Sequence, residues 1–155
     1  MSPTFAWELL DQLLNDGAAA LVCRHHVEIS KHPDQVPLAI DWASYRRKEE
    51  TGQFKVFTAR FEGDLLGYIG WEIFVPTRYQ GTTYCNADVY WLSPDRRGMG
   101  WGKAFFHAAK AALPRPCKVQ WRRKIGVHDE RIDAILRSLD LVPEDIVYSG
   151  FFPAE

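Results

Sequence analysis

Apolar residues in the first part of the chain recur with the spacing of helices. Ser2 and Pro3 make a favourable helix start, and Gly17 can end that helix. Between these signals the apolar positions repeat at helical intervals, at Ala6, Leu9, Leu10, Leu13 and Leu14. The pattern could continue as a second helix over 18–30, although residues 21–27 fit a helix or a strand equally well.

Prolines and polar residues separate these helices from the rest of the chain. Pro33 and Pro37 break regular structure. Asp41 is placed to cap a short helix that runs through Glu50, and Gly52 ends it. The first third of the chain therefore predicts helices only.

Beyond this point the pattern becomes strand-like. Two apolar runs, 54–61 and 65–75, flank a short turn that contains Gly63, so they predict an antiparallel hairpin. Pro76 stops the second strand, and residues 77–83 form a polar loop. The remaining elements alternate: a strand over 84–92, a helix over 104–113, a strand over 117–122, an amphipathic helix over 129–139 and a final strand over 146–152.

The order of these elements predicts an α/β fold with a mixed sheet. Three strands form an antiparallel meander, and the strand–helix–strand unit over 84–122 adds one parallel pair. A length of 155 residues suits a single domain over 1–155 that buries its own core.

Net charge, hydropathy and the spacing of cysteines and histidines argue against several classes of function. The formal net charge of −1 indicates no polyelectrolyte partner. No signal-peptide pattern is present, and no apolar run approaches the roughly 18 residues of a membrane span, so we expect a cytoplasmic protein. Cys23, Cys85 and Cys117 are widely spaced without a CxxC pair, and the adjacent His25 and His26 cannot share a helix face, so no metal site is predicted.

The strongest chemical signal lies where the strand over 84–92 turns into the following helix. Glycines occupy alternate positions there, at Gly98, Gly100 and Gly102. Glycine allows close backbone approach, and a helix start offers N–H groups and partial positive charge to a phosphate. Arg97 and Lys103 add fixed charge, so the stretch predicts a pyrophosphate cradle; the alternative is a glycine-rich turn without a ligand.

The order Arg97-x-x-Gly100-x-Gly102 resembles the acyl-CoA loop of the GNAT superfamily of N-acetyltransferases. The likeness covers about residues 36–152, and 129–141 resembles the family's fourth helix. Within the superfamily the chain is similar to a branch often encoded by bacteriophages, on the combination of Tyr45, Gly52, Asp88, Tyr90, Leu92 and Pro94.

This resemblance implies a fold, a cosubstrate and a reaction. The fold is a central, mostly antiparallel sheet flanked by helices, with a parallel strand pair splayed at the acyl-CoA site. Acetyl-CoA would donate an acetyl group, without a metal, to a primary amine that attacks directly in a ternary complex. The resemblance assigns CoA binding to the bulged strand end and the loop, at Trp91, Leu92, Ser93, Arg97, Gly98, Met99, Gly100, Trp101, Gly102 and Lys103.

Two carboxylates are candidates for the general base. Strand alternation places one set of side chains on the same face, namely Asn86, Asp88, Tyr90 and Leu92. A carboxylate within an apolar strand is costly unless it is paired or functional, and a raised pKa would suit a base. We therefore expect Asp88 to be the base, with Glu72 across the sheet as second candidate; the alternatives are a structural Asp88 and a solvent-facing or substrate-binding Glu72.

The chain departs from the family where its general acid is expected. The tyrosine of the fourth helix, which in many members protonates the departing thiolate, aligns with Leu136. The family's helix-four Asn is Asp129, and its Gly-Phe pair is Asp140-Leu141. Tyr148 on the predicted final strand is the best remaining phenol and Tyr90 the next, with packing as the alternative for both.

The acceptor stays open between a small molecule and a protein amine. Aromatic residues fall on the elements that would frame it, at Trp42, Tyr45, Trp71, Phe74, Tyr79 and Tyr84. One alternative is a non-catalytic acyl-CoA-binding or protein-interaction domain of the same fold. Nucleic-acid binding by the basic stretch 121–124 is not favoured at this net charge. A homodimer is a common outcome in this superfamily.

Overall fold

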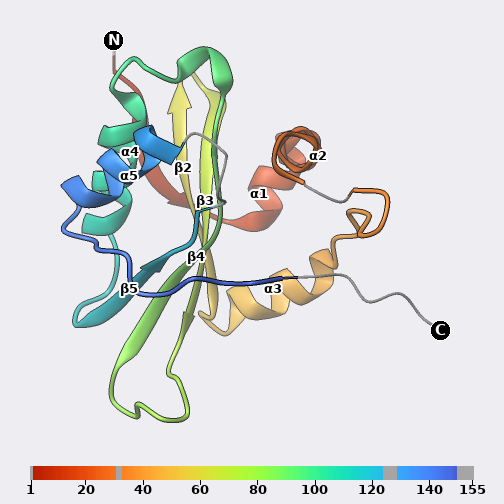
Figure 1. The fold of residues 1–155 in the computed structure, drawn as a ribbon. Helices are drawn as coiled ribbons and strands as arrows, with labels where there is room; N and C mark the ends of the chain where they lie inside the picture. Colours follow the sequence, from red (N-terminus) through yellow and green to blue (C-terminus); the bar gives the residue numbers. More distant parts are fainter. Residues whose placement is uncertain (1, 31–32, 124–128, 150–155) are drawn as a thin grey trace.

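The computed structural model describes residues 2–30, 33–123 and 129–149, which build a five-stranded sheet between two layers of helices (Figure 1). The strands follow one another across the sheet in sequence order: β1 (Thr4–Glu8), β2 (Phe54–Phe61), β3 (Asp64–Phe74), β4 (Thr83–Leu92) and β5 (Cys117–Trp121). Neighbouring strands are antiparallel except β4 and β5, which are parallel. The predicted mixed sheet with one parallel pair is confirmed.

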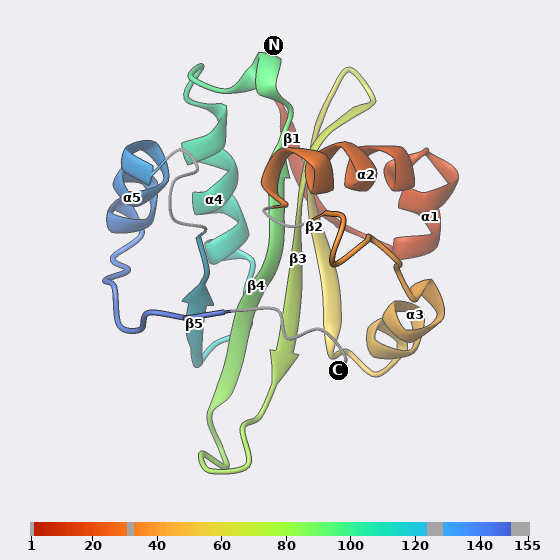
Figure 2. The ribbon, with the colours of Figure 1, turned by 45° about the vertical axis from the view of Figure 1, so that its right-hand side comes forward.

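Helices cover both faces of this sheet (Figure 2). On one face lie α1 (Leu10–Asn15), α2 (Ala18–Ile29) and α3 (Trp42–Glu50). On the other face lie α4 (Trp101–Ala111) and α5 (Asp129–Ser138). Each layer encloses an apolar cluster of its own, because sheet side chains point alternately to the two faces.

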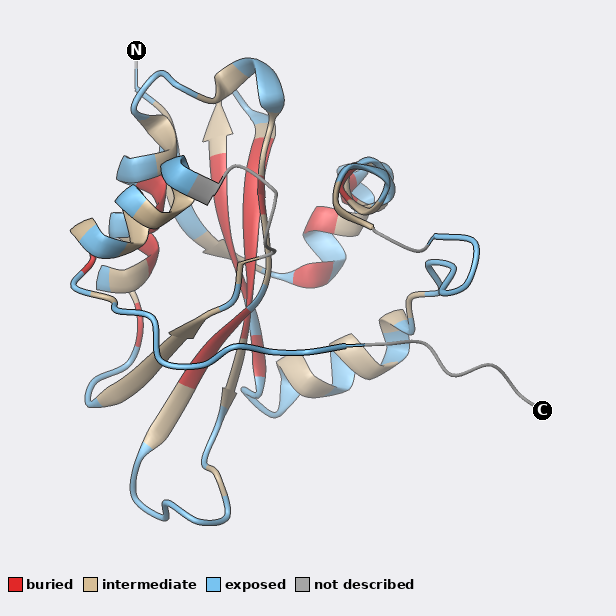
Figure 3. Cartoon of the chain, in the orientation of Figure 1, coloured by how far each residue is buried: buried red, intermediate tan, exposed pale blue. Residues whose placement is uncertain are grey.

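Alternation along β3 divides the core between the two layers. Ile69 and Trp71 are fully buried in the cluster under α4, beside Phe105. Tyr68 belongs to the cluster under α1 and α2. Glu72 has the same parity as Tyr68, so its carboxylate lies on the face of α1, α2 and α3. Figure 3 shows the buried residues concentrated along the middle of the sheet and on the helix faces turned toward it.

The N-terminal helix predicted from residue 2 is wrong in its first half. Residues 4–8 form β1, which pairs along its whole length with β2. Phe5 stacks on Phe105 with ring centroids 5.5 Å apart, and Trp7 packs on Phe57 at 5.0 Å. These two rings are two positions apart and face the same cluster, as in a strand. A partner strand some fifty positions later supplies the hydrogen bonds of the backbone. Tertiary pairing therefore overrides the helical spacing, which holds only in the short helix α1.

The predicted final strand is also absent where the structure describes it. Residues 141–149 carry no regular structure, and residues 150–152 of that prediction lie outside the described part. Ile146 and Val147 leave 71% and 72% of their surface exposed, so no neighbouring strand covers them. An ion pair of 2.8 Å between Lys118 and Glu144 connects this segment to β5.

The other predicted elements are confirmed to within a few residues. Gly63 turns the β2–β3 hairpin with a φ of +92°. Asp41 caps α3, where its Oδ1 accepts a hydrogen bond of 2.9 Å from the backbone N–H of Ser44. The undecided stretch over 18–30 is the helix α2.

Candidate functional site

The glycine-rich loop joins β4 to α4 as the sequence predicts. After β4 the chain makes one 3₁₀ turn, Pro94–Arg96, and α4 begins at Trp101. Gly98 and Gly100 both adopt left-handed conformations, with φ of +83° and +81°. A Cβ at either position would meet no atom within 4 Å, so the loop needs these glycines for their backbone conformation.

The first turn of α4 presents its amides at the end of this loop. The N–H of Ala104 is the first that bonds back along the helix, to the carbonyl of Gly100 at 3.2 Å. The preceding amides belong to the helix start, where N–H groups lack intrahelical acceptors. Lys103 lies exposed in the same turn, and the helix dipole adds partial positive charge. This geometry suits an anionic group.

Other loop side chains are used for packing. Trp101 lies against Phe61, with ring centroids 5.1 Å apart, and the guanidinium of Arg96 stacks on both rings. Met99 is 56% exposed. The Ser93 N–H donates to the carbonyl of Leu66 at 2.7 Å, which continues the β3–β4 contact beyond the strand. The contacts of Trp101, Arg96 and Ser93 shape the loop, whereas Met99 is free of the core.

The Arg97 guanidinium is engaged within the protein. It forms an ion pair with Glu28 on α2, through contacts of 2.5 and 2.9 Å, and its Nε donates to the carbonyl of Leu92 at 2.8 Å. Glu28 also accepts a hydrogen bond of 3.0 Å from Trp91 Nε1. The hydrogen bonds from Arg97, followed by that from Trp91, lower the pKa of Glu28 to about 2 despite partial burial. Glu28 therefore connects α2 to the loop, a role that sequence reasoning missed.

A β-bulge at Asp88 interrupts β4. Gly70 of β3 stands opposite Val89, and Trp71 stands opposite Ala87, so Asp88 is an extra residue on β4. The resemblance placed the bulge of this strand at residues 91–93, and the structure corrects that position. The bulge coincides with the end of the β4–β5 pairing, whose last partners are Ala87 and Trp121.

The bulge also corrects the predicted face of β4. Tyr90 and Leu92 pack in the cluster under α4, together with Ala87. Asn86 has the opposite parity to Ala87 and faces the other layer, so the four residues predicted to share one face do not. The physical reason is that an extra residue shifts the side-chain alternation by one position.

Beyond the bulge, β4 parts from β5. Residues 89–92 remain paired with β3 on one side, but the register with β5 has ended. Within the part of the chain that the structure describes, no strand pairs with their other edge. The parallel pair thus opens toward the glycine loop, as the resemblance implies for a splayed acyl-CoA site, and leaves backbone groups for an extended ligand.

Asp88 and Glu72 meet on the face of α3. The Tyr45 hydroxyl on α3 lies 3.4 Å from Asp88 Oδ2, and Lys48 forms an ion pair of 2.7 Å with Glu72. Although Asp88 is exposed as a whole residue, burial of its carboxyl group, and then the charge of Glu72, raise its pKa above the usual range. Burial, and then the charge of Asp88, also raise the pKa of Tyr45. The charge of Glu72 therefore acts on the Asp88 carboxylate, in agreement with the expected position of Glu72 across the sheet from Asp88.

The structure places the remaining candidates elsewhere. Tyr148 is 90% exposed and lies in the segment without regular structure, so the strand meant to carry it is missing. Tyr90 packs edge-on against Phe106 and Trp121, and burial raises its pKa to about 12. Leu136 packs against the cluster under α4.

Two residues of the basic stretch over 121–124 are engaged inside the protein, whereas Arg122 is exposed and residue 124 lies outside the described residues. Trp121 stacks on Phe106 at 4.5 Å in the core, and Arg123 pairs with Asp133 at 2.5 Å. In the described ranges no group of three or more His, Cys, Asp or Glu side chains could hold a metal ion. The described helices are likewise too short or too polar to cross a membrane.

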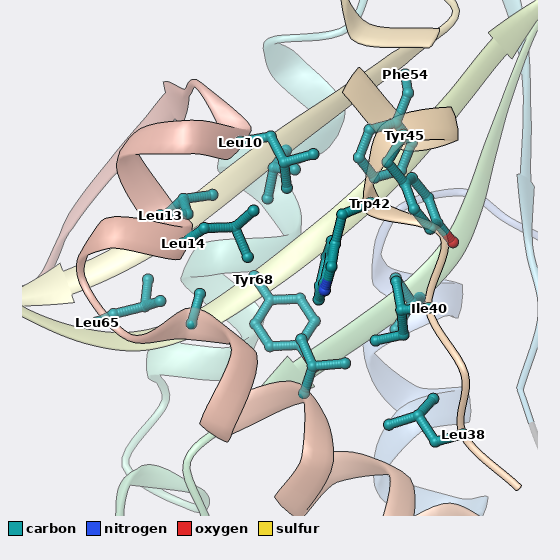
Figure 4. Close-up of a pocket in the computed structure, with 15 residues that line it drawn as sticks. Leu10, Leu13, Leu14, Leu38, Ile40, Trp42, Tyr45, Phe54, Leu65 and Tyr68 are labelled. Carbon is teal, nitrogen blue, oxygen red and sulfur yellow. The ribbon is translucent and has the colours of Figure 1, made fainter. Parts of the chain in front are cut away.

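An apolar cavity of about 190 Å³ adjoins the acidic pair on the same face (Figure 4). Helices α1, α2 and α3 and the middle strands form its wall. Of the aromatic residues expected to frame the acceptor, Trp42 and Tyr45 line it. Trp71 is instead buried in the opposite cluster, and Phe74, Tyr79 and Tyr84 contact one another outside the cavity.

Solved structures with the same fold include acetyltransferases that act on amines. An aminoglycoside acetyltransferase from an uncultured soil metagenomic sample aligns with a TM-score of 0.74 and 16% identity, over 99% of this chain and 100% of that one. A ribosomal-protein-alanine N-acetyltransferase from Brucella melitensis biovar Abortus 2308 aligns with a TM-score of 0.69 and 18% identity, over 98% and 100%. An aminoglycoside 6'-N-acetyltransferase from Acinetobacter baumannii aligns with a TM-score of 0.62 and 12% identity, over 99% and 100%.

These likenesses show that the chain has the GNAT fold. No protein-family model matches the sequence, and the comparison with curated proteins finds no match either. At these identities the likeness carries the fold alone. Nothing in it bears on the resemblance to a bacteriophage branch.

Proposed function

We propose that this protein is an N-acetyltransferase that moves an acetyl group from acetyl-CoA to a primary amine by direct attack in a ternary complex. The observation that carries the proposal is the bulge at Asp88. It ends the β4–β5 pairing, so that a strand edge is left for an extended cosubstrate, and it sets a carboxylate at the point where the strands part. The fold shared with known N-acetyltransferases supports the same conclusion.

The glycine loop and the parted strand fit acetyl-CoA. The backbone from Gly98 to Lys103 would hold the pyrophosphate, because it combines left-handed glycines with the start of α4. Residues 89–92 would pair with the pantetheine arm through their open backbone edge. Acetyl-CoA supplies the thioester, and the loop and strand supply its position.

We assign the general base to Asp88, with Glu72 as its neighbour. Primary amines are mostly protonated at neutral pH, so the acceptor must lose a proton before attack. A raised pKa makes the Asp88 carboxylate a stronger base than an ordinary aspartate. The free amine then attacks the thioester carbon and forms the C–N bond. When the C–S bond breaks, the second proton lost from nitrogen neutralises the departing CoA thiolate, which gives the free thiol. Lys48 holds Glu72, so Glu72 acts as a positioning residue through its charge.

Thermal unfolding with separate ligands tests cosubstrate binding. Acetyl-CoA at a hundredfold excess over its Kd should stabilise the native state by about 2.7 kcal/mol, whereas ATP and NAD should not. Lys103→Glu should weaken acetyl-CoA binding about tenfold, because it reverses the charge beside the pyrophosphate. Since an acidic residue in the first turn stabilises a helix, the variant should stay folded. Lys55→Glu, an equal charge change at an exposed position of β2, is the matched control.

Release of free CoA thiol with a panel of amines then separates an enzyme from a binding domain. Turnover with any primary amine supports the acetyltransferase. Stabilisation by acetyl-CoA without turnover would instead favour the non-catalytic domain, for which Leu136 in place of the family's tyrosine is the supporting residue. If millimolar acetyl-CoA leaves the unfolding temperature unchanged, the proposed function is wrong.

A further inference from the structure

The described residues that line the apolar cavity on the face of α1, α2 and α3 carry no charge. Fifteen residues line its volume of about 190 Å³, and aliphatic and aromatic side chains provide nearly all of the surface. Leu10, Leu13 and Val22 enclose it from α1 and α2, while Trp42 projects into its centre from α3 (Figure 4). Such a space favours a ligand part that is itself apolar.

The two tyrosine hydroxyls of the wall already have partners. The Tyr68 hydroxyl lies 2.8 Å from His25 Nδ1, and the Tyr45 hydroxyl lies 3.4 Å from Asp88 Oδ2. Figure 4 shows the Tyr45 hydroxyl directed away from Leu10, Leu13 and Leu14. A ligand rich in hydroxyl or ammonium groups would therefore lose more hydrogen bonds to water there than the wall can replace, which is unfavourable.

The cavity adjoins the carboxylates of the proposed active site. Tyr45 belongs to both, because its ring lines the cavity while its hydroxyl meets Asp88. Gly70 and Val89, which are paired across the bulge, form the cavity wall next to Asp88. A single ligand can thus bring a cationic group to Asp88 and Glu72 and place an apolar group inside the cavity.

We infer that the acceptor is a primary amine that carries one apolar, ring-sized body, an arylalkylamine or a compact alkylamine. This inference rests on the proposed function. The ammonium group lies at Asp88 and Glu72, and the body fills the cavity beyond Tyr45. The size agrees, since an apolar cavity of about 150 Å³ binds benzene and this one is somewhat larger.

The charge at the cavity's edge distinguishes this occupant from a longer acyl chain. Glu72 is already paired with Lys48, so the Asp88 carboxylate is the group that attracts an ammonium ion, whereas the acyl part of a thioester offers it no charge. The same argument separates the inferred acceptor from a polycation. The described residues that line the cavity include no carboxylate with which to bind further ammonium groups.

The test compares acceptors that share an amine and differ in their body. With acetyl-CoA held constant, kcat/KM is measured for phenethylamine, ethylamine, spermidine and kanamycin. Burial of a phenyl group should raise kcat/KM for phenethylamine about 10- to 100-fold over ethylamine. Isothermal calorimetry of phenethylamine with the protein in the presence of CoA gives a second readout that needs no turnover.

A matched pair of variants on α2 locates the effect. Val22→Phe fills the cavity and should reduce the ratio of kcat/KM for phenethylamine to kcat/KM for ethylamine about tenfold. Val27→Phe makes the same substitution at a position that is 80% exposed on the same helix, and it should leave that ratio unchanged. Trp42→Ala enlarges the cavity and should shift the preference toward the larger tryptamine. Thermal unfolding shows that each variant is folded.

The outcomes separate failure of this inference from failure of the proposed function. Transfer to spermidine or kanamycin without a preference for phenethylamine overturns the inferred acceptor class and leaves the acetyltransferase intact. Efficient use of octanoyl-CoA in place of acetyl-CoA, abolished by Val22→Phe, assigns the cavity to the acyl chain and also overturns the inference. Binding of phenethylamine without release of CoA by any amine supports the cavity's ligand and contradicts the proposed function.

Discussion

At the scale of single residues, the candidate site depends on where one carboxylate stands. Asp88 is the extra residue of a bulge, so it leaves the alternation of β4 and reaches Tyr45 on α3. Burial and the charge of Glu72 raise its pKa, and the hydrogen bond from Tyr45 opposes that rise. A carboxyl group in this position is poised to exchange protons, which is what the proposed chemistry requires.

We expect Asp88→Asn to remove most of the activity without unfolding the protein. The rate should fall about 100-fold or more, the usual contribution of a positioned general base. The wild-type kcat/KM should rise with pH through the raised pKa of Asp88, and the variant should lack that limb. Steady-state rates measured across pH check this, with Asp64→Asn at an exposed position of β3 as control.

The pH dependence of the unfolding free energy provides a second test of Asp88→Asn. Because the native pKa of Asp88 is raised, the native state binds its proton more tightly than the unfolded chain does. The stability linked to that proton is complete below the unfolded pKa and is lost as pH rises through the native pKa. Asp88→Asn should therefore not lower the unfolding temperature at neutral pH. Full activity with an unaltered pH profile in this variant would rule out Asp88 as the base.

At the scale of elements, an ion pair fixes the glycine loop to α2. Glu28 accepts from both Arg97 and Trp91, and the side chains of the Glu28–Arg97 pair are 27% and 23% exposed. Arg97 in turn donates to the carbonyl at the end of β4. The helix, the loop and the strand end are thus held together by charge-assisted hydrogen bonds, which are stronger than neutral ones.

Glu28→Gln should loosen this junction. We expect a loss of about 1–3 kcal/mol of unfolding free energy at neutral pH, together with weaker acetyl-CoA binding. Because the native pKa of Glu28 is lowered, its contribution is present above the unfolded pKa and is lost as pH falls from about 4.5 to about 2. Denaturant unfolding at several pH values should show the difference from wild type shrinking in that window. Glu50→Gln, at an exposed position of α3, should show no such difference.

At the scale of the whole molecule, the proposed cosubstrate site is a continuous seam between two segments, the open edge of residues 89–92 and the first turn of α4. These segments meet at the end of the sheet that carries the glycine loop (Figure 1). The cavity proposed for the acceptor lies across the sheet from α4. Donor and acceptor would therefore approach Asp88 from different directions, as direct transfer in a ternary complex requires.

Hydrogen exchange tests this arrangement in the intact protein. Acetyl-CoA should slow amide exchange in residues 89–92 and 98–103, because it would cover their backbone. Exchange in β1 and α1 should change far less, since these elements lie outside the seam. Mass spectrometry of peptides after timed labelling provides the measurement. Protection confined to other segments would show that the cosubstrate binds elsewhere.

The sequence by itself determined the elements whose signals are local. The cap at Asp41, the turn at Gly63 and the loop from Gly98 to Lys103 depend on neighbouring residues, and the structure confirms each of these elements. The order of strands and helices then limited the fold to a mixed sheet with one parallel pair. The carboxylates at Glu72 and Asp88 could also be predicted, because a charge inside an apolar strand is conspicuous.

Only the tertiary structure decided where distant segments meet. Residues 4–8 form a strand because β2 supplies the hydrogen-bond partners, and the loop residue Arg97 is engaged by Glu28 of α2. The bulge at Asp88 follows from the register between β3 and β4, which no residue of β4 encodes alone. The cavity likewise combines side chains from three helices and three strands. Pairing, register and enclosure are properties of packing between segments, so they appear only when the chain is folded.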